Sequence, residues 1–397
     1  MTPTSAGEPL SRQALLDAVE RALSQRLGRA IRVGAATEIS APERRNLLLR
    51  CSLEPFGGDA PATVIVKHVR GDYDPARLDS WDTIRFLREL CGASFLEVAG
   101  PPGAHLPRFF GGDVERGFVV LEDLGPHHQS LVEPLLEQDA ASAERALLAY
   151  VERLGRLHAD CSGRLSAYDE IVHVFGSRIR SALANRHVVG IARPKALIEK
   201  LASMIEVHPD AEREFHEALA MVAGPGPFHT FVHGDPCPDN VFYVGDSLRL
   251  IDLEFAHPAL ALVDAMYPRM GFPTCWCANR VPGELIGRLE TAYRRELLRA
   301  CPEAGDDRVF GSALVDACGY WLFISLEWML ERALTEDERW GISGKRARIL
   351  ARLESFIEAA EHFQRRIALR DLAARLLDSL RGSWAAVEPL PVYPAFL

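Results

Sequence analysis

The feature that most constrains the fold is a change in hydrophobic pattern at Gly125-Pro126. Before this dipeptide, apolar and β-branched residues form short runs separated by Pro, Gly and Asp clusters, which is the pattern of β-strands. After it, apolar residues recur at helical spacing. The sequence therefore predicts an α+β fold, with a small β-rich amino-terminal lobe over residues 1–124 and a larger, mostly helical carboxy-terminal lobe over residues 125–397.

The individual elements follow from the same patterns. In the first lobe we expect helices over residues 10–27 and 75–91, and strands over residues 32–39, 47–54, 62–69, 106–110 and 118–121. In the second lobe we expect helices over residues 140–158, 194–205, 211–222, 282–300, 311–334 and 345–380. Short strands over residues 228–232, 240–244 and 247–253 interrupt these helices, and the Pro-rich tail, residues 389–394, is expected to be extended.

Composition excludes several classes of protein. Of the 397 residues 48% are hydrophobic, so the chain can bury a core and is not disordered. Its formal net charge is -10 and it has no basic run, which argues against a nucleic-acid partner. The longest apolar stretch, residues 317–326, is shorter than the roughly 20 residues of a membrane span. We expect a cytoplasmic protein without a membrane partner; the oligomeric state stays open.

The cysteines indicate neither a metal centre nor a disulfide framework. The sequence has 8 cysteines spread along its length, and no C-x-x-C pair is present to complete a zinc site. We predict that all of them are reduced thiols.

The densest cluster of polar residues is the segment 231–242, which lies between two apolar strands. Gly234 permits a backbone geometry that larger residues resist, so the loop can curl and bring Asp235 and Asn240 to one site. Asp252 emerges at the end of the next apolar strand. A carboxylate accepts protons, and carboxylate and amide oxygens bind hard cations. These three residues therefore predict an oxygen-rich magnesium site beside a general base.

The spacing of these residues resembles a known family. His233-x-Asp235 followed by Asn240, and then Asp252-x-Glu254, is similar to the catalytic loop and metal-binding Asp of the aminoglycoside phosphotransferase and choline kinase family. The resemblance implies a bilobed, protein-kinase-like fold that uses ATP and Mg²⁺. It also implies transfer of the γ-phosphoryl group to a hydroxyl of a small molecule, either an antibiotic such as an aminoglycoside or a metabolite such as an amino alcohol or sugar.

The family pattern assigns roles to individual residues. Asp235 would be the catalytic residue that orients the acceptor and takes its proton, and Asn240 and Asp252 would hold magnesium. The lobe over residues 1–124 would bind the nucleotide, and the lobe over residues 125–397 would carry catalysis and bind the acceptor.

Lys67 supports this reading independently of the family. It lies inside an apolar strand, where an unpaired ammonium would be costly, so an anionic group is expected nearby. The resemblance implies that Lys67 binds nucleotide phosphates and pairs with a carboxylate of the next helix. That helix offers Asp79, Asp82 and Glu89, and we select Asp82. The alternative is a lysine at a strand edge that faces water.

The segment around Glu122 resembles the interlobe hinge of the family. The backbone of Glu122 and Leu124 would bond to the edge of the adenine, which would stack against Val64, Val120 and Leu121.

Several other polar or aromatic residues receive structural or minor roles. We expect His158 to be a buried structural histidine, and we expect His233 and Asp264 to brace the catalytic loop. Arg45, in the loop that stands where protein kinases have a glycine-rich phosphate loop, is expected to be solvated, and Trp276 is expected to line an acceptor pocket.

Two alternatives belong to other functional classes. A catalytically silent kinase-like scaffold or binding protein is disfavoured because Lys67, Asp235, Asn240 and Asp252 are all present. A protein kinase is disfavoured because no Ala-Pro-Glu type segment follows Asp252. The sequence does not identify the acceptor, and it does not distinguish ATP from GTP.

Overall fold

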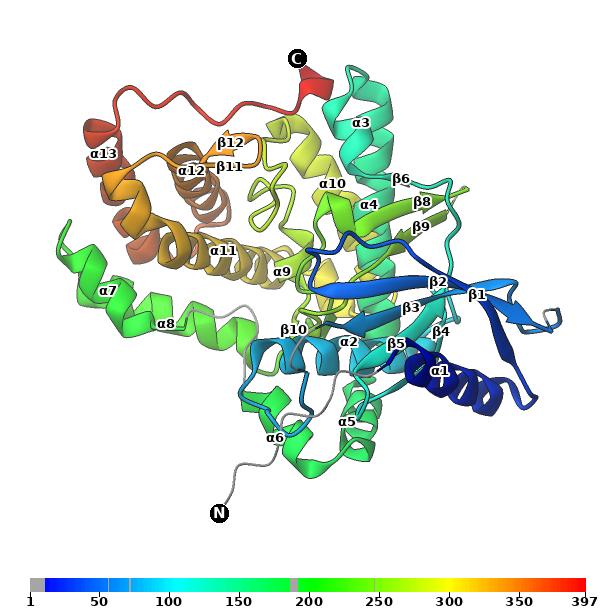
Figure 1. Cartoon of the computed structure of the whole chain (residues 1–397). Coiled ribbons are helices and arrows are strands. Elements are labelled where there is room, and N and C mark those ends of the chain that lie inside the picture. Colours follow the sequence, from blue (N-terminus) through cyan, green and yellow to red (C-terminus); the bar gives the residue numbers. More distant parts are fainter. Residues whose placement is uncertain (1–10, 56, 71–72, 186–191, 246) are drawn as a thin grey trace. The chain divides into compact units, whose positions relative to one another are not determined.

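The computed structural model describes residues 11–55, 57–70, 73–185, 192–245 and 247–397 (Figure 1). The chain forms two compact units. The first unit comprises residues 1–128, 166–187 and 249–256, and the second comprises residues 129–165, 188–248 and 257–397. Two segments from the later part of the chain therefore join the amino-terminal unit, whereas the predicted division after residue 124 follows the sequence order alone and stays a prediction.

The first unit contains a 5-stranded antiparallel sheet with the strand order β1-β2-β3-β5-β4. Its strands are β1 (Arg32–Glu38), β2 (Asn46–Glu54), β3 (Thr63–Val69), β4 (Phe109–Asp113) and β5 (Phe118–Glu122). Successive side chains of a strand point to opposite faces of the sheet, so a helix can pack on each face. The predicted strands of this lobe are confirmed, although β4 begins three residues later than the sequence pattern indicates.

Helices α1 (Arg12–Leu27) and α2 (Trp81–Ala99) approach β4 closely. A Cβ atom on Gly112 would lie 2.6 Å from a methyl carbon of Leu90 in α2, and a Cβ atom on Gly111 would point at α1. These two adjacent glycines permit both helices to pack tightly against opposite faces of the strand. The apolar side of α1 forms one buried core with β2, β3 and β5. Residue 10, where we predicted the first helix to begin, lies outside the described residues.

Two further helices of the first unit are not predicted by the sequence pattern. They are α5 (Leu165–Val174) and α6 (Ser177–Asn185). Tyr168 of α5 contacts Phe95 of α2 edge to face, with ring centroids 5.7 Å apart. This contact, together with the packing of α6 on α2, connects both helices to the first unit.

The second unit is mostly helical, as predicted. Its helices are α3 (Val132–Leu136), α4 (Ala140–Cys161), α7 (Pro194–Ala202), α8 (Pro209–Ala223), α9 (Leu262–Ala265), α10 (Gly283–Leu297), α11 (Asp307–Thr335), α12 (Lys345–Phe363) and α13 (Ile367–Ser383). The predicted helix over residues 345–380 is two helices, because Gln364 and Arg366 adopt left-handed backbone conformations with φ of 52° and 51°. This unit also contains the 3₁₀ turns η2 (Pro302–Gly305) and η3 (Pro394–Phe396).

Helix α11 is the core helix of this unit. Among the described residues it alone has the length and apolar composition of a membrane span. However, 89% of its 18-residue apolar stretch is buried inside the protein. Packing against α8 and α12 therefore accounts for its hydrophobicity.

Short strands frame the loop over residues 233–240 of the second unit, for which we keep the name catalytic loop from the family pattern. Strand β7 (His229–Val232) pairs antiparallel with β10 (His257–Leu260), which the sequence pattern does not predict. The loop that follows β7 ends in the 3₁₀ turn η1 (Pro238–Asn240), and β8 (Val241–Val244) then pairs with β6 (Gln129–Ser130). The remaining strands are β9 (Ser247–Leu250), β11 (Arg339–Trp340) and β12 (Ser343–Gly344).

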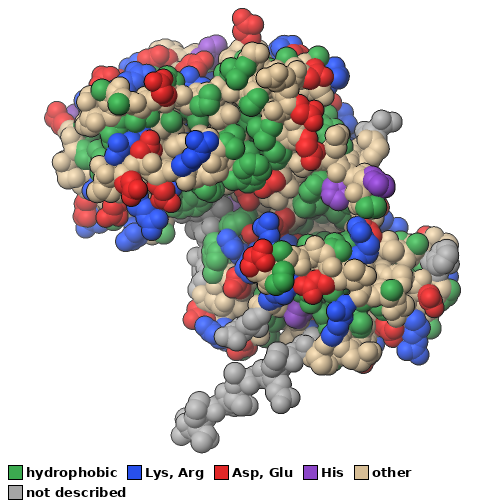
Figure 2. All heavy atoms as spheres, turned by 45° about the horizontal axis from the view of Figure 1, so that its top comes forward, with side chains coloured by type: hydrophobic (Ala, Val, Ile, Leu, Met, Phe, Trp, Pro, Cys, Tyr) green, Lys and Arg blue, Asp and Glu red, His purple; other side chains and the backbone are tan. Residues whose placement is uncertain are grey.

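The extended tail and the surface charges also match the sequence pattern. Tyr393 donates its backbone N–H to the carbonyl of Arg280 at 3.0 Å, and its ring packs edge to face on Phe272. On the face drawn in Figure 2, basic and acidic side chains are intermixed rather than gathered by sign.

Candidate active site

The first unit contains a buried ionic cluster centred on Lys67. The Nζ atom of Lys67 in β3 lies 2.8 Å from the carboxylate of Glu89 in α2 and 2.6 Å from Oδ1 of Asp252. Burial alone would lower the pKa of Lys67, but the two carboxylates outweigh it and raise the pKa above its usual value. Lys67 is therefore a cation at neutral pH, and the prediction of an anionic neighbour is confirmed.

The prediction of Asp82 as the helical partner of Lys67 is wrong. Helix α2 begins at Trp81, so Asp82 lies in its first turn with its side chain 48% exposed. Glu89 lies two turns later and is buried, which places its carboxylate beside the strand lysine. A charged residue in the middle of the apolar stretch of this helix is the signal that identifies Glu89 in the sequence.

The prediction that Arg45 is solvated is wrong. Its guanidinium forms an ion pair with Glu254 and lies 3.3 Å from the carboxylate of Asp82. The loop between β1 and β2 is thus connected to the segment that carries Asp252.

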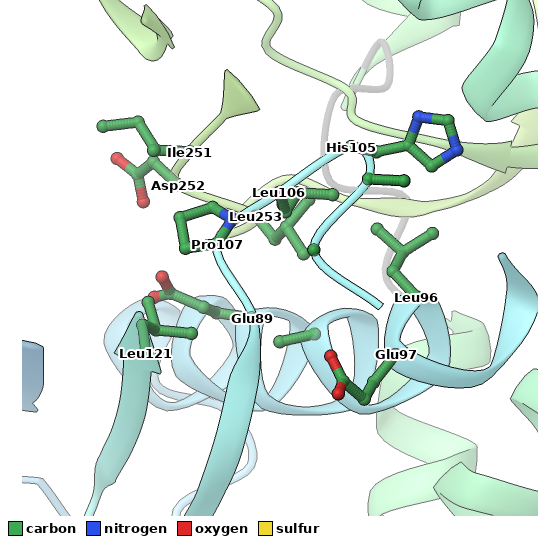
Figure 3. Close-up of a pocket in the computed structure, with 13 residues that line it drawn as sticks. Glu89, Leu96, Glu97, His105, Leu106, Pro107, Leu121, Ile251, Asp252 and Leu253 are labelled. Atoms are coloured by element: carbon green, nitrogen blue, oxygen red, sulfur yellow. The ribbon is translucent and has the colours of Figure 1, made fainter. Parts of the chain in front are cut away.

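The predicted adenine contacts are partly wrong, because a strand alternates its faces. Val64 and Val120 are fully buried in the core beneath α1. Residues two apart share a face, so Ile65 lies on the same face of β3 as Lys67. Its partner across the ladder is Leu121, which does line a cavity with Glu89 and Asp252 (Figure 3).

The hinge-like segment is fixed by local bonds. The amide of Glu122 donates to the carbonyl of Arg108 at 2.9 Å, and its carboxylate accepts the Arg108 amide at 3.0 Å. Asp123 accepts two hydrogen bonds from the guanidinium of Arg50, at 2.7 and 3.1 Å. Leu124 follows directly, and its backbone role stays a prediction.

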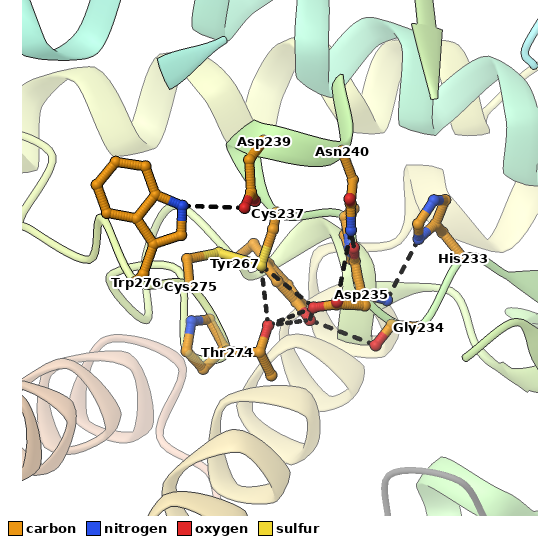
Figure 4. The surroundings of a disulfide bond; sticks show 12 residues. His233, Gly234, Asp235, Cys237, Asp239, Asn240, Tyr267, Thr274, Cys275 and Trp276 are labelled. Carbon is orange, nitrogen blue, oxygen red and sulfur yellow. Dashed lines mark hydrogen bonds between the residues drawn. A yellow bond between two sulfur atoms is a disulfide. The ribbon is translucent and has the colours of Figure 1, made fainter. Parts of the chain in front are cut away.

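In the second unit, Asp235 is held from several sides (Figure 4). Thr274 donates its hydroxyl to Oδ1 of Asp235 at 2.5 Å, and the phenol oxygen of Tyr267 lies 3.4 Å from the same oxygen. The side-chain amide of Asn240 donates to the backbone carbonyl of Asp235 at 3.0 Å. The loop therefore presents Asp235 and Asn240 together, as the sequence spacing predicts.

Asn240 and Asp252 each carry an oxygen atom of the kind that binds magnesium. The Nδ2 group of Asn240 is used as a hydrogen-bond donor, so its amide oxygen is the atom of this side chain that can act as a hard ligand. Asp252 adopts a left-handed φ of 67°, a conformation that costs free energy and is typical of functional sites. No group of three or more His, Cys, Asp or Glu side chains in the described ranges is arranged to hold a metal. Mg²⁺ commonly binds one or two protein ligands and completes its shell with water and phosphate oxygens.

A buried carboxylate braces the catalytic loop. Asp264 accepts the backbone N–H groups of His233 and Gly234 at 2.7 and 2.9 Å, and it lies 3.2 Å from Nε2 of His158. Burial would raise the pKa of Asp264, but these hydrogen bonds and the nearby histidines lower it below its usual value. The imidazole of His233 in turn accepts the amide of Asp235 at 3.3 Å. The predicted structural roles of His158, His233 and Asp264 are confirmed.

Two cysteines next to this loop are joined. Cys237 and Cys275, which are 38 residues apart in sequence, form a disulfide with a Cα–Cα distance of 5.6 Å. The prediction of reduced thiols is wrong for this pair, since the fold brings together cysteines that no local spacing relates. The other six cysteines are free and buried.

Trp276 follows the disulfide. Its side chain is partly exposed, and its indole N–H donates to the carboxylate of Asp239 in the catalytic loop at 3.0 Å. Its predicted place in an acceptor pocket stays a prediction.

Sequence reasoning missed Thr274 altogether, because nothing in its local sequence distinguishes it.

Comparison with known proteins identifies the family. The model of the phosphotransferase enzyme family (APH) matches residues 56–304, more than half of the chain. The chain belongs to this family. It is therefore a small-molecule kinase, and the predicted family, fold class and enzyme class are confirmed.

Several solved structures of kinases match this chain at low sequence identity. Choline kinase from Cryptosporidium parvum Iowa II is 12% identical, with 89% of this chain and 94% of that chain covered and a TM-score of 0.44. Macrolide 2'-phosphotransferase MphH from Brachybacterium faecium is 16% identical, with 80% and 96% covered and a TM-score of 0.37. The streptomycin–ATP–APH(2")-IIa ternary complex is 13% identical, with 78% and 92% covered and a TM-score of 0.44. No curated protein sequence matches this chain.

Proposed function

We propose that this phosphotransferase transfers the γ-phosphoryl group of ATP to a hydroxyl of a small molecule, with Asp235 as its catalytic residue. The observation that carries the proposal is the oriented carboxylate of Asp235, which is held by Thr274 on one oxygen and stands beside the amide of Asn240. The acceptor would be an antibiotic such as an aminoglycoside or macrolide, or a metabolite such as an amino alcohol or sugar. The reaction would take place in the cytoplasm.

The first unit would bind the nucleotide. Lys67 is held in a fixed position by Glu89, so its ammonium would contact the α- and β-phosphates without further ordering. Since the amide of Glu122 already donates to Arg108, the adenine edge would use the carbonyl of Glu122 and the backbone of Leu124.

The magnesium ligands would be the carboxylate of Asp252 and the amide oxygen of Asn240. When bound, Mg²⁺ would neutralise charge on the phosphate oxygens. Asp252 would then be shared between the ion and Lys67, with which it forms an ion pair in this structure.

Asp235 would orient the acceptor hydroxyl and accept its proton as the new bond to phosphorus forms. In phosphoryl transfer little covalent chemistry is required of the protein, so most of the rate enhancement comes from positioning and charge stabilisation. The bracing of the loop by Asp264 supports such a role, because it fixes the backbone on which Asp235 is carried.

A catalytically silent scaffold is the alternative. It is disfavoured because Lys67 has a buried carboxylate partner and Asp235 is held by a hydroxyl and an amide. Such costly polar arrangements are expected where chemistry depends on them.

A screen of ATP consumption against hydroxylated antibiotics and metabolites tests the proposal. Asp235→Asn keeps the shape of the side chain but removes its basic oxygen, so turnover should fall by about 10²–10⁴-fold while ATP still binds. Asp210 carries an exposed carboxylate on α8, so Asp210→Asn is the matched control and should behave as the wild type. Near wild-type turnover by Asp235→Asn on an identified acceptor would mean that Asp235 is not the catalytic base.

A further inference from the structure

The hydroxyl of Thr274 belongs to a short hydrogen-bond chain that ends at Asp235. Tyr267 and Thr274 place their oxygens 3.1 Å apart, and Thr274 lies 2.5 Å from Oδ1 of Asp235. Burial, followed by the nearby charge of Asp235, raises the pKa of Tyr267 well above its usual value, so the phenol keeps its proton. Thr274 has one hydroxyl proton and donates it to Oδ1 of Asp235. The order of donation is therefore Tyr267 to Thr274 to Asp235.

Thr274 is carried by a segment without regular secondary structure, residues 270–276, which we call the Thr274 segment. An irregular segment would ordinarily move too freely to hold a partner at a fixed distance. This one is joined covalently to the catalytic loop, because the disulfide links Cys275, the neighbour of Thr274, to Cys237, two residues after Asp235. The Sγ atom of Cys237 itself lies 3.2 Å from Oδ1 of Asp235.

Two buried arginines of α12 hold the backbone of the Thr274 segment. Arg352 donates to the carbonyls of Met270 and Pro273 at 3.2 and 2.9 Å. Arg348 donates to the carbonyls of Cys275 and Trp276 at 2.7 and 3.1 Å. Backbone carbonyls on both sides of Thr274 are thus fixed by guanidinium groups from one helix.

These arginines are unusual because their partners are neutral. Their exposed fractions are 0% for Arg348 and 2% for Arg352, and within the described part of the chain neither forms an ion pair. Burial lowers the pKa of Arg348 to about 10 and that of Arg352 to about 9, so both stay protonated at neutral pH. Burying two cations against carbonyl groups is costly, and the free energy is recovered only where several hydrogen bonds are made.

We infer that Thr274 is a positioning residue for Asp235. Its hydroxyl fixes Oδ1 and thereby directs the other carboxylate oxygen, Oδ2, to the acceptor hydroxyl. This inference rests on the proposed function of Asp235. It adds to that proposal a specific residue. Thr274, on a segment held by the disulfide and the two arginines, sets the orientation of the Asp235 carboxylate before any substrate binds.

Loss of the hydroxyl should therefore affect turnover more than nucleotide binding. In Thr274→Val the shape is kept, but Oδ1 loses a charge-assisted hydrogen bond and the carboxylate can rotate. We expect kcat to fall about ten- to hundredfold, with the KM for ATP changed less than about twofold. Thr274→Ser restores the hydroxyl and should recover most of kcat.

The experiment measures hydrolysis of magnesium-ATP with water as the acceptor, so that it needs no identified substrate. Rates are expressed per ATP-binding site, determined by titration, which corrects for any unfolded protein. Thr291→Val, which removes an exposed hydroxyl that bonds only within α10, is the matched control and should leave kcat unchanged. Tyr267→Phe removes the first donor of the chain and should lower kcat several-fold.

Three results separate the possibilities. Wild-type kcat in Thr274→Val, with Asp235→Asn inactive, overturns this inference and leaves the proposed function intact. Equal losses in Thr274→Val and Thr274→Ser also overturn it, because the methyl packing and not the hydroxyl would then matter. Retained activity in Asp235→Asn overturns the proposed function, and the inference with it.

Discussion

The ammonium of Lys67 lies 2.8 Å from the carboxylate of Glu89, and only 12% and 7% of their side chains are exposed. Burial raises the pKa of Glu89, and the charge of Lys67 opposes that rise. Lys67 has a second ion-pair partner in Asp252, whereas Glu89 depends on Lys67, so removal of the ammonium leaves a buried carboxylate without its ion-pair partner.

Lys67→Met should lower both stability and nucleotide affinity. The free energy of unfolding should fall by about 3 kcal/mol, because Glu89 loses its partner. Lys67→Met/Glu89→Gln should recover most of this stability but none of the ATP affinity. Urea unfolding and calorimetric titration of ATP measure the two effects, and Lys195→Met, at an exposed lysine, should change neither. Equal ATP affinity in Lys67→Met and wild type would show that Lys67 does not contact phosphate.

Asp252→Asn should remove the dependence of nucleotide binding on magnesium. Asn tolerates the left-handed conformation at this position, so the backbone is preserved while the anionic ligand is lost. Titration of ATP with and without Mg²⁺ checks this. Asp82→Asn, on the same unit but outside the Lys67 cluster, is the control and should retain the full magnesium effect. The magnesium site lies elsewhere if Asp252→Asn responds to the ion as the wild type does.

The residues of the motifs could be predicted because their chemistry is local. Asp235 and Asn240 share one loop, and the burial of Lys67 follows from the strand around it. Which carboxylate reaches Lys67 depends on where α2 begins, and this boundary lies six residues later than the predicted helix start at residue 75. The shift moves Asp82 to an exposed first turn and places Glu89 against the sheet.

Other features depend on contacts that no local pattern encodes. Thr274 meets Asp235 across 39 residues, and Cys237 meets Cys275 across 38. The misassigned adenine contact at Val64 has a different origin, since the period of a strand already places Ile65, and not Val64, on the face of Lys67.

The bracing carboxylate Asp264 should give stability that depends on pH. Asp264→Asn replaces an acceptor of three hydrogen bonds by a side chain with only one acceptor atom, and should cost about 3 kcal/mol at pH 7. The folded pKa of Asp264 is lowered, so its contribution is complete above the unfolded pKa of about 3.9 and is lost as the pH falls through the folded value. The difference in unfolding free energy between wild type and variant should thus shrink below about pH 4.

Urea unfolding of both proteins at several pH values measures this difference, and titrations of groups that do not interact with Asp264 cancel in it. Asp307→Asn, at a carboxylate with 88% side-chain exposure, should differ from the wild type by less than about 0.5 kcal/mol throughout. A difference that stays constant from pH 7 to pH 3 would contradict the lowered pKa.

Thiol titration of the unfolded protein tests the disulfide beside Asp235. Without reductant the unfolded chain should expose the six free cysteines, and after reduction all 8. Cys275→Ser should give the same count in both conditions, since Cys237 is then free. Because the bond closes a loop of 38 residues, its loss should lower the free energy of unfolding by about 4 kcal/mol. It should also loosen the Thr274 segment and reduce kcat in the same direction as Thr274→Val. Full reactivity of the wild type before reduction would show that the two cysteines are thiols, and the two arginines of α12 would then be the main anchors of Thr274.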